Sequence, residues 1–137
     1  MNTEIIMKKI IGINHIGIRV SDLNDAKSFY EQLGYKLIIG PIGSEPVAIM
    51  KHPSGIVINL VLNMDINLNK NMLMDFNENY PDSSHMALDV SSLKTIQDTI
   101  ESLNIQITEG PVTLPDGSQM FFIRDQNLNV IEFHQNA

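Results

Sequence analysis

Residues 14–23 read Asn14-His15-Ile16-Gly17-Ile18-Arg19-Val20-Ser21-Asp22-Leu23, and the chain repeats their pattern 70 residues later. The matched pairs at this offset include His15 with His85, Val20 with Val90, Ser21 with Ser91, Leu23 with Leu93, Leu33 with Leu103, and Gly40-Pro41 with Gly110-Pro111. Towards the C-terminus the offset becomes 73, and there Asn59 matches Glu132. A chain of 137 residues is therefore predicted to fold as one domain made of two similar modules that share a core.

Each module is predicted to contain a strand, a helix and three further strands, because apolar residues alternate in some segments and recur at helical spacing in others. The first module, approximately residues 10–62, is expected to have a strand at Asn14–Val20, a helix from Ser21 or Asp22 to about Leu33, and strands at Tyr35–Ile39, Pro46–Lys51 and Gly55–Leu62. The second, approximately residues 84–135, is expected to have a strand at His85–Val90, a helix capped by Ser91 or Ser92, and strands at Ile105–Glu109, Gln119–Arg124 and Leu128–His134. Residues 63–83, rich in Asn and Asp, are predicted to be a linker within the single domain 1–137.

The composition argues against several classes of function. A net charge of −7 gives no attraction to phosphate backbones, so nucleic acid is not an expected partner. The absence of cysteine excludes disulfides, thiolate metal sites and cysteine nucleophiles. The sequence has neither a signal-peptide pattern nor an apolar run of about 20 residues, so we expect a cytoplasmic protein without a membrane partner.

Two histidines and two polar residues occupy matched strand positions: His15, Asn59, His85 and Glu132. Because strand faces alternate, these residues are expected opposite the apolar face that packs on the helices, on the concave side of a curved sheet. A carboxylate within an apolar strand costs several kcal/mol unless it is paired, protonated or bound to a cation. Imidazole and carboxylate suit Mn, Fe, Co, Ni or Zn. We therefore predict a divalent metal site with ligands His15, His85 and Glu132, and with Asn59 either as a weak fourth ligand or as a residue that orients water or substrate.

Each residue taken alone also has a structural interpretation. A single histidine on a strand is more often a core or surface residue than a ligand, and Glu132 could form a salt bridge with Arg19 or Arg124. His134 shares the face of Glu132 near the chain end and is predicted to lie at the rim, while His52 is predicted to be solvated at a hairpin turn. The repeat favours the metal interpretation because it selects the positions independently of their chemistry.

Three stretches resemble the glyoxalase and vicinal-oxygen-chelate proteins. Asn14–Leu23, followed by Phe29-Tyr30 and Leu33-Gly34, is similar to the opening of that superfamily. Ser84–Val90 resembles the start of its second module, and Phe121–Phe133 resembles its closing strands. The resemblance covers nearly the whole chain. It implies an α+β fold in which paired βαβββ modules form an incomplete eight-stranded barrel, usually in a dimer.

The resemblance also implies that metal ligands come from the first and last strands of each module, which here gives His15, Asn59, His85 and Glu132. Glyoxalase I proteins usually carry a carboxylate at the place of Asn59, so the set reduces to two histidines and one glutamate. That triad is similar to the ligands of extradiol dioxygenases and fosfomycin-inactivating thiol transferases. The sequence leaves open whether the site forms within one chain or across a homodimer.

The function expected from this resemblance is that of a metal-dependent lyase or isomerase of glyoxalase I type, as in lactoylglutathione lyase. It would rearrange a small oxygenated substrate that chelates a divalent ion (Ni, Zn, Co, Mn or Fe), with Glu132 as both ligand and catalytic general base. Three alternatives remain: an Fe(II) dioxygenase of extradiol type, a fosfomycin-type thiol transferase, and a non-catalytic drug-binding protein like bleomycin-resistance proteins.

Overall fold

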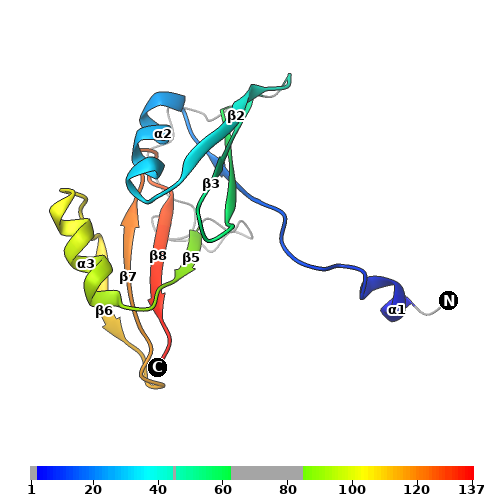
Figure 1. The fold of residues 1–137 in the computed structure, drawn as a ribbon. Helices are drawn as coiled ribbons and strands as arrows, with labels where there is room; N and C mark the ends of the chain where they lie inside the picture. Colours follow the sequence, from blue (N-terminus) through cyan, green and yellow to red (C-terminus); the bar gives the residue numbers. More distant parts are fainter. Residues whose placement is uncertain (1–2, 45, 63–84) are drawn as a thin grey trace, which may run out of the picture.

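The computed structural model describes residues 3–44, 46–62 and 85–137, so the predicted linker at 63–83 lies outside the described residues. Its element order is α1 (Thr3–Met7), β1 (Ile16–Arg19), α2 (Leu23–Gln32), β2 (Lys36–Ile42), β3 (Val47–Lys51), β4 (Val57–Val61), β5 (His85–Asp89), α3 (Leu93–Ser102), β6 (Glu109–Thr113), β7 (Gln119–Arg124) and β8 (Val130–Gln135). The predicted α+β fold of two βαβββ modules is confirmed (Figure 1). No helix in the described ranges is long and apolar enough to cross a membrane.

Each module forms its own four-stranded sheet, with strand orders β1-β4-β3-β2 and β5-β8-β7-β6. In both sheets the first strand pairs in parallel with the last, and the other neighbours pair antiparallel. The repeat seen in the sequence is therefore a repeat of topology. It brings the first and last strands of each module, which carry the candidate ligands, next to each other.

One apolar core joins the two modules. Alternate residues of the strands face it together with residues of both helices, and the buried members include Ile18, Val20, Tyr30, Ile58, Leu60, Met86, Ile100, Phe121, Ile123, Ile131 and Phe133. The apolar faces of both sheets are thus turned towards this shared core. The opposite faces carry exposed residues on the first strand of each module, Gly17 and Arg19 on β1 and His85 and Asp89 on β5, while Glu132 on β8 is buried.

The helix boundaries follow local chemistry. Asp22 caps α2 by accepting a hydrogen bond from the Asp25 amide at 2.9 Å, and Ser92 caps α3 by accepting one from the Thr95 amide. The structure thus selects Asp22 over Ser21 and Ser92 over Ser91. Gly34 follows α2 with a φ of 95°, the left-handed conformation that a glycine adopts readily at the end of a helix.

A network of hydrogen bonds also joins the modules. The carboxylate of Asp125, in the turn between β7 and β8, accepts hydrogen bonds from the Tyr30 hydroxyl of α2 at 2.8 Å, from the amides of Asn127 and Asn129, and from the Asn129 side chain. Asn129 also donates to the Arg19 carbonyl at 2.8 Å. Asp125 is only 4% exposed, and burial raises the pKa of its carboxyl group and that of the Tyr30 hydroxyl. We call this network the Tyr30–Asp125 latch.

Apart from the exact ends of several strands, the structure differs from the sequence-based expectation in two places. The strand predicted at Ile105–Glu109 is instead β6, which begins at Glu109, where pairing to Phe122 of β7 starts. Ile105 and Ile107, the apolar residues that alternate before Glu109, pack against the core. Their alternation therefore resembles that of a strand although they precede β6. The short helix α1 was not predicted. It lies at the end of an N-terminal arm that projects away from the two sheets (Figure 1).

Candidate metal centre

The second module holds half of the predicted site. Parallel pairing of β5 with β8 sets Ala87 beside Glu132 and His85 beside Val130. The side chains of His85 and Glu132 converge, with His85 Nε2 lying 3.6 Å from Glu132 Oε1. Glu132 is 8% exposed, so its carboxylate is largely shielded from water, and it has an imidazole as its neighbour.

The other carboxylate oxygen contacts a residue that the sequence placed only at the rim. His134 Nδ1 lies 2.8 Å from Glu132 Oε2. An ionised carboxylate only accepts hydrogen bonds, so Nδ1 carries the proton and donates it. This contact holds the carboxylate in one orientation. The sequence signal that could have predicted this contact is the two-residue spacing of Glu132 and His134. That spacing sets both side chains on one face of β8.

The first module carries the remaining two candidates. Asn59 pairs with Gly17 of β1 and Ile49 of β3, and it is half-buried on the face opposite Ile58 and Leu60. His15 precedes β1 rather than lying within it, is exposed, and its Nδ1 lies 2.8 Å from the Asn14 side-chain oxygen.

The described part of one chain does not gather His15, His85 and Glu132 into one centre. Among the residues that the structure describes, no group of three or more His, Cys, Asp or Glu is placed to hold a metal ion. His15 therefore does not join His85 and Glu132 within the chain. The reason lies in the fold, because the apolar faces of both sheets share one core and the faces that carry the ligands are turned away from it.

The pair in the second module nevertheless fits a divalent ion. Two ligands about 2.1 Å from a common ion, at about 100–110° to each other, lie roughly 3.3 Å apart. The 3.6 Å between His85 Nε2 and Glu132 Oε1 is close to that separation. The donor set, imidazole nitrogen and carboxylate oxygen, is one that first-row divalent metals prefer.

The structure also bears on two of the structural interpretations, the salt bridge of Glu132 with Arg124 and the solvated His52. Arg124, a possible partner of Glu132, forms an ion pair with Glu109 through its Nη2 at 3.1 Å from Oε1. His52 is not simply solvated. Its Nδ1 lies 2.8 Å from the Ser54 hydroxyl, and its ring centroid is 5.2 Å from that of Tyr35.

The family model described as the Glyoxalase/Bleomycin resistance protein/Dioxygenase superfamily matches residues 12–133. This chain belongs to that superfamily. The match spans both modules and confirms the resemblance of the opening and closing strands. No curated protein sequence matches the chain.

Solved structures of the superfamily have the same fold. A glyoxylase/bleomycin resistance protein/dioxygenase domain from Frankia sp. is 20% identical, with a TM-score of 0.72 and coverage of 93% of each chain. A glyoxalase/dioxygenase from Nostoc punctiforme is 19% identical, with a TM-score of 0.69 and coverage of 92% of this chain and 91% of that one. A mutant of a fosfomycin resistance protein from Listeria monocytogenes, in complex with Mn(II) and a dihydroxypropylphosphonic acid, is 16% identical, with a TM-score of 0.72 and coverage of 93% and 94%.

Proposed function

We propose that this chain is a divalent-metal-dependent enzyme of glyoxalase I type, which isomerises or rearranges a small substrate with adjacent oxygen atoms. The observation that carries the proposal is the carboxylate of Glu132, buried on β8, with His85 Nε2 3.6 Å from one oxygen and His134 Nδ1 2.8 Å from the other. A buried carboxylate that is contacted by two imidazoles is unusual in an apolar strand, and a bound cation would compensate its desolvation.

His85 and Glu132 would hold the ion together with His15 of a second copy of the chain. When bound, the ion supplies a Lewis acid that stabilises negative charge developing on substrate oxygen. Glu132 would accept the substrate proton, and the His134 Nδ1–H would hold that carboxylate in place while it does so. The amide oxygen of Asn59 is neutral and adds no charge to the ligand set, so it would be a weak ligand. Asn59 would instead donate its amide hydrogens to substrate or water.

The reaction class is tested by direct assay. Protein loaded separately with Ni, Co, Zn, Mn or Fe(II) is expected to convert methylglyoxal and glutathione to a thioester, which is followed by its ultraviolet absorbance. Absence of turnover with every metal would contradict the glyoxalase assignment. The same loaded samples should then be given fosfomycin, because the Listeria protein, with a similar fold, is a fosfomycin resistance protein and the ligand set here lacks the second carboxylate.

A site shared between two chains predicts complementation. His15→Ala and Glu132→Ala are expected to bind no metal alone. After unfolding and refolding of an equal mixture, half of the dimers contain both variants, and one of their two sites has all ligands intact. About a quarter of the wild-type metal content should return.

The control for this experiment is a mixture of His85→Ala with Glu132→Ala. Both residues belong to the same half-site, so either arrangement of the site leaves every copy with a defect and no metal should return. Recovery in the first mixture but not in the second supports a shared site. If metal returns in neither mixture, the shared site is contradicted. The metal content of the wild-type protein then remains a separate test of the proposed function.

A further inference from the structure

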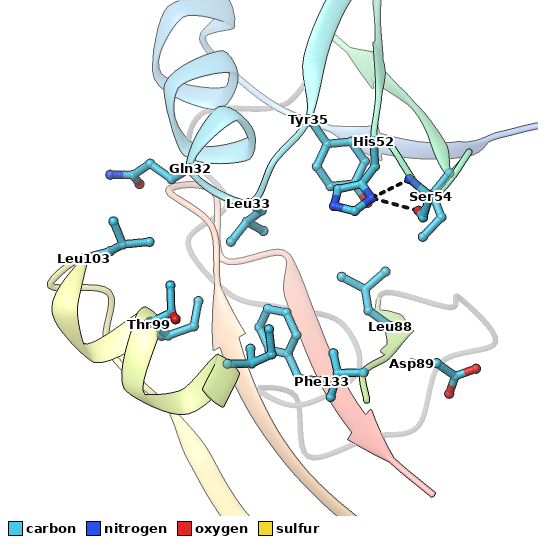
Figure 2. A pocket seen from close by; sticks show the side chains of 14 residues that line it. Gln32, Leu33, Tyr35, His52, Ser54, Leu88, Asp89, Thr99, Leu103 and Phe133 are labelled. Atoms are coloured by element: carbon cyan, nitrogen blue, oxygen red, sulfur yellow. Dashed lines mark hydrogen bonds between the residues drawn. The ribbon is translucent and has the colours of Figure 1, made fainter. Parts of the chain in front are cut away.

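An apolar cavity lies between the modules, on the other side of β8 from Glu132. Its volume is about 280 Å³. Phe133 of β8 and Leu88 of β5 line it from the second module, and residues of α3 form one wall (Figure 2). The turn between β3 and β4, with His52 and Ser54, forms another wall. None of the candidate metal ligands lines the cavity, so it is separate from the candidate metal centre.

The cavity exists because the two modules are not equivalent at this point. The turn that holds His52 matches the turn that holds Asp125. The His52 amide bonds the Ile56 carbonyl at 2.9 Å and the Asp125 amide bonds the Asn129 carbonyl at 3.0 Å, in the same pattern 73 residues apart. In module two the Asp125 turn receives Tyr30 of α2.

At the corresponding place, the helix α3 offers Ile100, which occupies the position of Tyr30 at the offset of 70 residues. Both Ile100 and His52 line the cavity. An isoleucine is shorter than a tyrosine and has no hydroxyl, so it does not reach the turn as Tyr30 reaches Asp125. Among the residues that the structure describes, the cavity lies where the equivalent junction holds the Tyr30–Asp125 latch.

A second observation points to a missing partner in the same place. Tyr35 lines the cavity and is 2% exposed, and its hydroxyl has no hydrogen-bond partner among the residues that the structure describes. Buried hydroxyl groups in native proteins are nearly always hydrogen-bonded. Figure 2 shows the Tyr35 ring beside His52, with the two rings tilted at 59° to each other.

We propose that this cavity binds a neutral, mainly apolar small molecule that has one hydroxyl or carbonyl group. A cavity of about 150 Å³ binds benzene, so 280 Å³ suits a molecule of about two fused rings. The polar group would pair with the Tyr35 hydroxyl. The lining contains one carboxylate, Asp89, and neither lysine nor arginine among the described residues, so an anion is disfavoured.

The probe for this proposal is 1-naphthol, titrated while methyl resonances of residues that line the cavity are followed by NMR. Saturable binding with a Kd on the order of 0.1 mM is expected. Naphthalene, which lacks the hydroxyl, and 1-naphthoate, which is an anion, should each bind at least about tenfold more weakly. Tyr35→Phe should reduce the affinity for 1-naphthol to that for naphthalene.

Two variants test the location. Ile100→Tyr restores the residue found at the equivalent position, and is expected to fill the cavity, raise Tm and abolish binding of 1-naphthol. Leu88→Phe fills less of the cavity and guards against poor folding of the first variant; it should weaken binding at least about tenfold. Leu114→Phe, at a partly exposed site outside the cavity, is the matched control and should bind as the wild type does.

The proposal is overturned if 1-naphthol does not saturate the wild-type protein, or if folded Ile100→Tyr and Leu88→Phe both bind it with wild-type affinity. Equal affinity for 1-naphthol and 1-naphthoate would overturn the inference that the ligand is neutral.

Discussion

Replacing Glu132 with alanine is expected to abolish binding of the divalent metal that we propose, from about one equivalent per chain to none, and to abolish turnover of any substrate that requires it. The carboxylate is the sole negative charge in the proposed ligand set, and its removal leaves only neutral imidazoles. We expect affinity for the metal to fall by more than about 100-fold, since removal of an outer-shell partner alone costs 10–100-fold. Metal content by elemental analysis after dialysis measures the effect.

The same measurement separates the roles of the neighbouring residues. His85→Ala should match the loss seen for Glu132→Ala, because its Nε2 faces the carboxylate. His134→Ala should lower metal affinity by about 10–100-fold without abolishing it, because it acts through Glu132. Glu31→Ala, which removes a glutamate from a surface pair with Lys27, is the control and should leave metal content unchanged. A wild-type protein that binds no metal after reconstitution would contradict the enzyme proposal and favour a binding protein.

Replacing Asp125 with alanine is expected to cause the largest loss of stability of any single change in the turn between β7 and β8. Four donors bond this carboxylate: the Tyr30 hydroxyl, two backbone amides and the Asn129 side chain. Each donor left buried without a partner costs about 1–3 kcal/mol. Part of this cost is offset, because burial already raises the pKa of Asp125 and so makes its charge unfavourable. We expect a net loss of about 3 kcal/mol in the free energy of unfolding, or about 10 °C in Tm.

Graded variants identify the source of this loss. Tyr30→Phe removes one of the four donors and should cost about 1 kcal/mol. Asp125→Asn keeps an acceptor oxygen without the charge, and should cost less than the alanine variant. Asp98→Ala, an exposed residue paired with Lys94, should change stability by less than about 0.5 kcal/mol. If Asp125→Ala costs no more than Asp98→Ala in urea unfolding, the latch does not stabilise the junction between the modules.

Strand faces, helix caps and module order could be predicted from the sequence because they depend on residues close together in the chain. The alternation around Asn59 and Glu132, and Gly34 after the first helix, are signals of this kind. The Tyr30–Asp125 hydrogen bond could not be predicted, because it joins residues 95 positions apart whose side chains individually indicate only a helix stripe and a turn. The candidate metal ligands show the same limit. The repeat selected the positions, but which faces of the two modules meet depends on where the core forms.

The parallel pairing of the first and last strands in each module has a consequence for the order of folding. The hairpins β3–β4 and β7–β8 close short turns, whereas Ile16 reaches Ile58 and His85 reaches Val130 only after about 40 intervening residues are enclosed. Closing a longer loop costs more chain entropy, so non-local pairs form late and slowly. We expect β8 to join β7 first and β5 last. His85 would then come into contact with Glu132 in the last folding step. A partly folded chain would have the Glu132 carboxylate in place without its histidine neighbour on β5.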